Sequence, residues 1–180
     1  WRPDLSWPDH KVADNGARAV VTAWSLDNTP DYMVVDITAG AKPNTQRYYQ
    51  SVDFLPGGLF GNDDYRTTLL VMRKIMAKDV LWTMGKGTES HQVQLDSNYY
   101  IGVFEVTQSQ FERIAGSDKN HSVFNNAAAK AMRPVDSVCY NDIRVTDGTD
   151  PWASSADYTG YMWPNNPNPK SFLGLLRTKT

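Results

Sequence analysis

The pattern of apolar and polar positions changes its period in the middle of the chain. Residues 99–106 are almost continuously apolar, which is typical of a strand that is covered on both faces. Residues 107–116 instead have the pattern of a helix of about two turns. The sequence therefore predicts a strand, a sharp corner and a short helix in succession.

The start of this predicted helix carries several signals that agree. Thr107 and Gln110 have the spacing of a capping box, in which each side chain accepts a hydrogen bond from a backbone N–H that the first turn leaves unpaired. Val106 and Phe111 are placed to form a hydrophobic staple across the cap. Gly116 suits the residue that ends a helix. A capped corner at Thr107 is therefore predicted.

A second corner is predicted at Cys139. An extended segment beginning with Arg133 and Pro134 leads to this cysteine, and Asp142 follows three residues later. The spacing of cap and acid repeats that of the first corner, but a hydroxyl would be a better cap than a thiol.

The first half of the chain is rich in short β-type segments. Turn-forming residues separate them, and the first two flank the turn cluster at 27–31, which predicts a hairpin with a longer loop. The predicted strands lie at 18–26, 32–40, 46–55, 67–75 and 79–85. Composition predicts loops at 56–64 and 145–170, and a helical pattern at 171–179.

Composition limits the class of protein. The 180 residues are 41% hydrophobic and 21% charged, which is ordinary for a soluble globular domain. A net charge of -2 argues against nucleic acid as a partner, and no apolar run reaches the roughly 20 residues that span a bilayer. The single cysteine, Cys139, excludes an intrachain disulfide. That fits a reducing compartment, and it equally fits an exported bacterial protein without disulfides.

The motifs at the two corners resemble the formylglycine-generating enzyme family, also called the sulfatase-modifying factor domain. The similarity covers residues 69–180. Its matching residues, in order, are Thr83-Met84-Gly85, Tyr100-Ile101-Gly102, Glu105-Val106-Thr107, Gln110-Phe111, Arg133-Pro134-Val135 and Val138-Cys139-Tyr140-Asn141-Asp142.

The resemblance implies an α+β fold of the C-type-lectin-like type, with short, mostly antiparallel strands and two packed helices. Residues 69–180 would form the N-terminal half of such a domain, and residues 1–68 a β-rich extension like that of some bacterial members. Within the motif, Met84, Gly85, Glu105, Thr107, Gln110, Arg133, Pro134, Cys139 and Asp142 would have structural roles.

The chain departs from the family pattern in two places. Cys139 stands where the family has a serine, and the family block L-P-T-E-A-E-W-E is absent. The copper-binding cysteine pair and the calcium ligands of the family follow that block. The resemblance therefore implies a scaffold without catalytic residues or cofactor of its own. Its partner would be the remainder of the same domain, and copper or calcium would be bound there. Because some family members lack the cysteine pair, the resemblance leaves open whether the complete protein is an enzyme.

Individual reactive residues mostly have structural interpretations. Cys139 could be a nucleophile or a copper ligand, but its position at a helix cap favours a structural role. Glu105 lies in an apolar strand and would need a partner if buried, for which Arg133 or a backbone N–H is the candidate. The three histidines are far apart and share no metal-binding spacing, and the composition of Asp147 and Asp150 suits a solvated turn better than a calcium loop.

The predicted loop at 145–170 is the best candidate for binding. Aromatic and amide side chains together are typical of glycan or peptide recognition, and recognition residues often lie on loops. The candidates are Trp152, Tyr158, Tyr161, Trp163, Asn165 and Asn166. An alternative function is therefore a non-catalytic C-type-lectin-like module of an exported bacterial protein, which binds glycan or protein through this loop. Equally, these aromatics could fold over a small core of their own.

Overall fold

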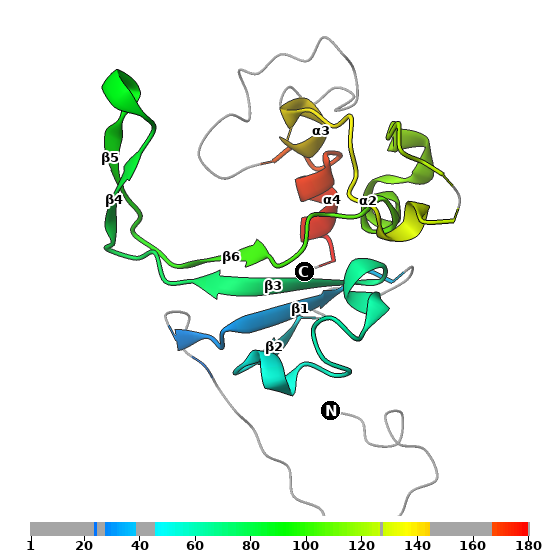
Figure 1. The fold of residues 1–180 in the computed structure, drawn as a ribbon, viewed down its shortest axis with the longest axis horizontal. Helices are drawn as coiled ribbons and strands as arrows, with labels where there is room; N and C mark the ends of the chain where they lie inside the picture. The colour runs from blue at the N-terminus through cyan, green and yellow to red at the C-terminus, as the bar shows by residue number, and fades with distance from the viewer. Residues whose placement is uncertain (1–23, 25–27, 39–45, 127, 145–166, 180) are drawn as a thin grey trace, which may run out of the picture.

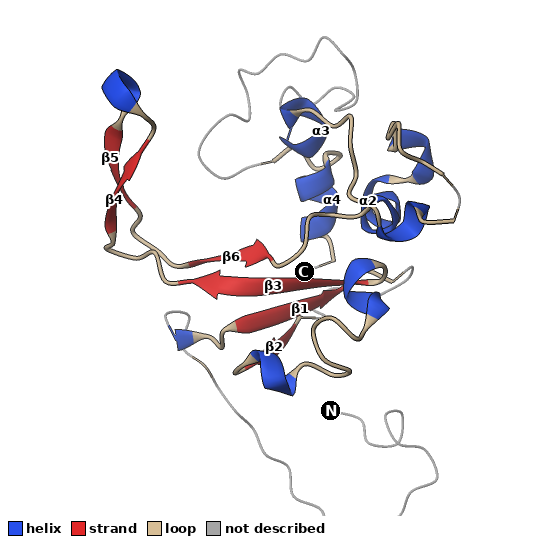
Figure 2. Ribbon diagram, viewed as in Figure 1, coloured by secondary structure: helices blue, strands red, loops and turns tan. Residues whose placement is uncertain are grey.

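The computed structural model describes residues 24, 28–38, 46–126, 128–144 and 167–179. These residues form a mixed α+β structure with a four-stranded sheet, a separate two-stranded hairpin and three short α-helices (Figures 1 and 2). The α+β class predicted from the sequence is confirmed at this level.

The main sheet is antiparallel throughout. Its strands, in spatial order, are β2 (Arg47–Tyr49), β1 (Tyr32–Asp36), β3 (Leu69–Ile75) and β6 (Tyr99–Gly102). Strand β1 lies between β2 and β3, with Val34 opposite Val71 on β3 and opposite Arg47 on β2. The sheet thus combines strands from both sides of the division predicted at residue 68. Of the predicted hairpin, the strand at 18–26 lies almost wholly outside the described residues.

A two-stranded hairpin projects from the end of the sheet that is far from the helices (Figure 1). It consists of β4 (Leu81–Met84) and β5 (His91–Gln94), with Trp82 opposite Val93. Gly85 follows β4 with a φ of 92°, and a Cβ at this residue would lie 2.5 Å from the Glu89 carbonyl oxygen. The turn at Met84 and Gly85 therefore requires glycine. Strand β5 was not predicted, because a single apolar residue in four gives no alternation.

The helices cover one face of the sheet, and an irregular segment covers the other. The helices on the first of these faces are α2 (Gln108–Ala115) and α4 (Phe172–Arg177). They contribute Phe111, Ile114 and Phe172 to a buried cluster that also contains Val35 and Ile37. The rings of Phe111 and Phe172 are stacked, with centroids 5.4 Å apart. The third helix is α3 (Tyr140–Arg144), and the short 3-10 helices are η2 (Val52–Phe54), η3 (Asp63–Arg66), η4 (Gly87–Glu89), η5 (Ser117–Lys119) and η6 (Lys130–Met132).

The opposite face of the sheet has its own core. Val34 and Val71 project from it because side chains alternate along a strand. Leu55 and Tyr65, from the segment that holds η2 and η3, pack against these two valines. The strand predicted at 46–55 is therefore only partly correct: β2 ends at Tyr49, and a 3-10 turn follows.

The prediction of a strand covered on both faces at 99–106 is wrong. Strand β6 ends at Gly102, and Ile101 is 52% exposed. Among the described residues β6 pairs only with β3, so it is an edge strand. Glu105 is exposed as well, so it needs no buried partner.

Both predicted corners are present. Thr107 is the N-cap of α2, and both hydrogen bonds of the capping box with Gln110 form. Gly116 follows the helix with a φ of 103°, a conformation that favours glycine. At the second corner the Cys139 backbone N–H donates to the Asp142 carboxylate over 2.7 Å, which is the acid half of a capping box.

Replacing Thr107 by alanine tests the first corner. The Thr107 hydroxyl accepts a bond from the Gln110 N–H and donates to the Arg66 carbonyl oxygen over 2.6 Å, and the residue is buried. We expect Thr107→Ala to lower the free energy of unfolding by about 2 kcal/mol, from the lost cap and an unpaired buried carbonyl. Thr88→Ala, at an exposed position, is the matched control and should change it by less than about 0.5 kcal/mol. Equal denaturant midpoints for the two variants would contradict the assignment.

Candidate functional site

The side chain of Gln110 joins helix α2 to the segment before β3. Its Oε1 accepts from the Thr107 backbone N–H over 3.0 Å. Its Nε2 donates to the carbonyl oxygens of Tyr65 and Leu69 over 3.0 and 2.7 Å. Gln110 is 2% exposed, so every one of these bonds is shielded from water. One side chain thereby caps the helix and fixes the helix to the sheet.

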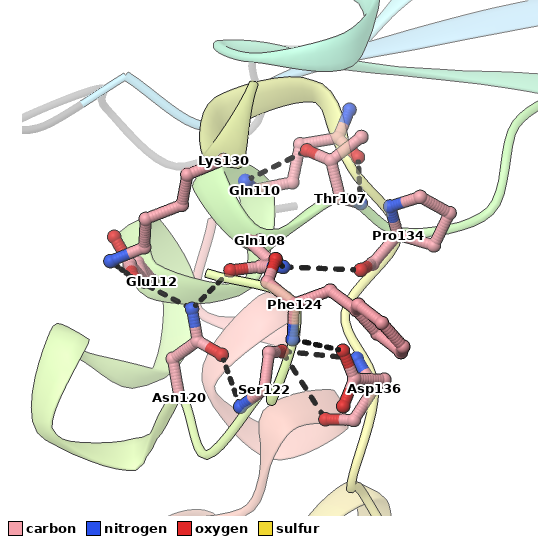
Figure 3. A network of polar contacts seen from close by, with 10 residues as sticks. All are labelled: Thr107, Gln108, Gln110, Glu112, Asn120, Ser122, Phe124, Lys130, Pro134 and Asp136. Atoms are coloured by element: carbon pink, nitrogen blue, oxygen red, sulfur yellow. Dashed lines mark hydrogen bonds and ion pairs between the residues drawn. The ribbon is translucent and has the colours of Figure 1, made fainter. Parts of the chain in front are cut away.

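A second buried glutamine, Gln108, joins α2 to the segments that follow it (Figure 3). Its backbone N–H donates to the Arg133 carbonyl over 2.8 Å, and its Nε2 donates to the Phe124 carbonyl over 2.8 Å. The Asn120 amide donates in turn to Gln108 Oε1 over 3.3 Å. The extended segment that leads to the second corner therefore lies against the first corner, and an antiparallel bridge between Thr107 and Pro134 adds to this contact.

Glu112 is the charged end of this network (Figure 3). Its carboxylate accepts from the Asn120 amide over 2.7 Å and pairs with the Lys130 ammonium at 2.8 Å. Burial alone would raise the pKa of the Glu112 carboxyl, but the hydrogen bonds from Lys130 and Asn120 lower it below its ordinary value. The carboxyl is thus an anion with its partners in place.

Asp136 holds the loop between η5 and η6. Its carboxylate accepts from the backbone N–H groups of Val123 and Phe124 over 2.9 and 3.4 Å, and from the Ser137 hydroxyl over 2.9 Å. The Val123 bond is the main reason that the pKa of Asp136 lies below its ordinary value. The Ser122 hydroxyl and the Asp136 backbone exchange two more bonds of 3.0 and 3.3 Å. The polar groups of this network are therefore hydrogen-bonded largely to one another.

An apolar groove lies between the sheet and α4. It comprises a cavity of about 380 Å³ beside β1 and one of about 160 Å³ beside β6, which share Met72, Leu173 and Leu176 as a wall. The first is lined also by Met33 and Val35, and by the polar residues Gln46, Arg144 and Arg177. The second is almost wholly apolar, with Leu70, Val106 and Phe172 among its lining residues. We call these two cavities the α4 groove.

The structure brings only some of the predicted motif residues together. Thr107 pairs with Pro134, and the N–H of the next residue, Gln108, donates to the Arg133 carbonyl. Met84 and Gly85 lie elsewhere, on the projecting hairpin. Cys139 and Asp142 form the second corner, and Cys139 is exposed.

The predicted binding residues of the long loop lie outside the described residues. They are Trp152, Tyr158, Tyr161, Trp163, Asn165 and Asn166. Arg144 and Asn168, which flank residues 145–166, are joined by a hydrogen bond of 3.1 Å from the Asn168 N–H to the Arg144 carbonyl.

The sequence did not predict the residues that complete the network, namely Gln108, Asn120, Ser122 and Asp136. For Gln108 a signal existed: it lies three residues before Phe111, on the same face of the helix as the buried stripe. The other three lie in irregular segments, where no periodicity marks burial.

In the described part of the chain, no group of three or more His, Cys, Asp or Glu side chains is placed to hold a metal ion. None of its helices has the length and apolar character to cross a bilayer. Comparison with known proteins found no matching family model, no matching curated protein and no matching solved structure.

The lowered pKa of Asp136 makes stability depend on pH. Below about pH 4 the unfolded state takes up protons that the folded state still excludes, so the stabilisation by this carboxylate is lost as the pH falls through its folded pKa. We expect Asp136→Asn to be less stable than wild type at about pH 6, and the difference to shrink towards about pH 3. Urea denaturation across this range measures it, with Asp96→Asn, at an exposed position outside the network, as the control. A difference that stays constant with pH would refute the role of the Asp136 charge.

Proposed function

We propose that the described residues are the scaffold of a C-type-lectin-like domain of the formylglycine-generating enzyme type. The observation that carries the proposal is the contact between the Thr107 corner and the extended segment that leads to the second corner. The motifs that resemble the family lie about 25 residues apart in sequence, yet the Gln108 N–H donates to the Arg133 carbonyl and the Val135 N–H to the Val106 carbonyl, over 2.8 and 2.9 Å. A chance match of short motifs would not have to converge on one junction.

The motif residues also have physical roles at their positions. Thr107 and Gln110 form the capping box, and Gln110 bonds to Tyr65 and Leu69 besides. Gly85 has a backbone conformation that favours glycine, with no room for a Cβ. Each requirement explains why that residue type is found there, which supports a structural motif rather than a catalytic one.

Under this proposal, the catalytic chemistry of the family belongs to a partner portion of the domain. Oxidation of a substrate cysteine in this family uses a copper-binding cysteine pair, and the chain has one cysteine. The α4 groove is the surface proposed for the partner portion. Its shared wall of Met72, Leu173 and Leu176 is only half-buried, so a packed segment would remove apolar area from water.

A second candidate, a lectin-like binding module, has one observation in its favour. The hydrogen bond between Arg144 and Asn168 holds together the two ends of the segment that contains the candidate aromatic residues. Segments with fixed ends on a rigid frame suit recognition. Under this alternative, loss of glycan or protein binding in a Trp152→Ala, Trp163→Ala double variant is expected.

The scaffold proposal is tested by adding the catalytic half of a formylglycine-generating enzyme-type domain as a separate polypeptide. Sedimentation velocity should show a complex, and Leu176→Gln in the groove should weaken it by about tenfold or more. Leu81→Gln, at a position 63% exposed on the hairpin, is the matched control and should leave it unchanged. The proposal would be contradicted if the chain stayed monomeric and formed no complex, and also did not enhance the fluorescence of anilinonaphthalene sulfonate, a dye that binds exposed apolar surface.

A further inference from the structure

A separate pocket lies on the sheet face opposite α2 and α4. It is a cavity of about 220 Å³ between the strands β1 and β2 and the segment that holds η2 and η3. In Figure 1 the part of this segment that holds η2 lies beside β2, on the side of the sheet away from the helices, whereas η3 lies where β3 begins, below α2. Its polar lining residues are Asp36, Arg47, Tyr49, Asn62, Asp64 and Tyr65, and we call it the β1–β2 pocket.

The floor of this pocket is set by strand register. Arg47 lies opposite Val34, so it is a diagonal neighbour of Asp36 on the same face of the sheet. Hydrogen bonds from Thr38, and then the charge of Arg47, hold the pKa of Asp36 below its ordinary value. A carboxylate and a guanidinium thus stand side by side in the floor of one cavity.

The roof is held in place by its own hydrogen bonds. The Pro56 carbonyl accepts from the Asn62 amide over 3.0 Å and from the Tyr65 hydroxyl over 3.1 Å. The Asp64 carboxylate accepts from the Thr68 hydroxyl over 3.2 Å. Tyr65 is 1% exposed, so the roof is anchored in the core. Because these side chains are already ordered without a ligand, ligand binding would cost little free energy for ordering them.

Size and charge together define the ligand. A volume of about 220 Å³ is below the roughly 300–1,000 Å³ of pockets for drug-sized molecules, so a small metabolite fits. The guanidinium of Arg47 suits a carboxylate, which it can bind with two parallel hydrogen bonds. The carboxylates of Asp36 and Asp64 suit an ammonium group. A small molecule that carries both groups on one carbon atom is an α-amino acid.

We propose that the β1–β2 pocket binds a free α-amino acid, with its carboxylate on Arg47 and its ammonium between Asp36 and Asp64. Among the lining residues two acids stand against one arginine, with Lys179 near Asp36 but outside the lining, so a cationic ligand side chain is favoured over an anionic one. The ring of Tyr49 and the apolar side chains of Val34 and Leu69 offer contact for the stem of the ligand. This inference does not depend on the proposed scaffold function, because the β1–β2 pocket shares only Tyr65 with the lining of the α4 groove.

The test is a titration of the complete 180-residue chain with L-lysine, L-alanine and L-glutamate, followed by amide chemical shifts in NMR spectra. Saturable shifts confined to β1, β2 and residues 56–69 are expected, with L-lysine binding about tenfold more tightly than L-glutamate. Acetate and methylamine, which carry one charge each, serve as probes for simple ion binding. If either produces the same shifts at the same concentration, the proposal is overturned in favour of ion binding alone.

Two variants test the proposed roles of Arg47 and Asp64 in binding. Arg47→Gln and Asp64→Asn replace exposed residues, so they should fold normally and weaken L-lysine binding by about tenfold or more. Arg73→Gln, at an exposed position on β3 outside the pocket, is the matched control and should leave the affinity unchanged. Unchanged affinity in Arg47→Gln, or no saturable shift with any of the three amino acids, would refute the site.

Discussion

The fold of the described residues depends on a buried side-chain amide at the start of one helix. Gln110 completes the capping box with Thr107, and its Nε2 also donates to the carbonyls of Tyr65 and Leu69. An amide that is buried without its partners would cost about 1–3 kcal/mol, so the helix cannot leave the sheet without losing several bonds together. The same corner places Gln108 where it bonds to Phe124 and Arg133, and thereby fixes the second corner as well.

The sequence predicted the parts of this arrangement whose interacting residues lie close together along the chain. The cap at Thr107, the glycine after α2 and the contact between Cys139 and Asp142 each need a spacing of ten residues or fewer. The long-range partners of Gln110 lie 41 and 45 residues earlier, and no local pattern encodes them. The length of β6 was overestimated for the same reason. An apolar run indicates a strand, but only the order of strands in the sheet decides that β6 is at an edge.

The candidate sites show a similar division. The resemblance identified motif residues that the structure explains by capping and backbone conformation, such as Gln110 and Gly85. The α4 groove and the β1–β2 pocket were not predicted, since each is walled by segments far apart in sequence. Charged residues such as Asp36 and Arg47 look like ordinary surface positions until strand register makes them neighbours. The protein thus offers two kinds of surface: an apolar groove for a packed segment beside α4, and a charged pocket beside β1 and β2.

Native-state hydrogen exchange tests most directly whether the Thr107 corner holds the structure together. Three backbone amides cross the junctions concerned: Val103 donates to Val71, Gln108 to Arg133 and Val135 to Val106. If the buried glutamines join these segments into one unit, the three amides exchange through a common opening, with equal free energies of opening. Gln110→Met then lowers all three free energies of opening together. Independent opening, with Gln108 and Val135 exchanging far more readily than Val103 and unaffected by Gln110→Met, would contradict this.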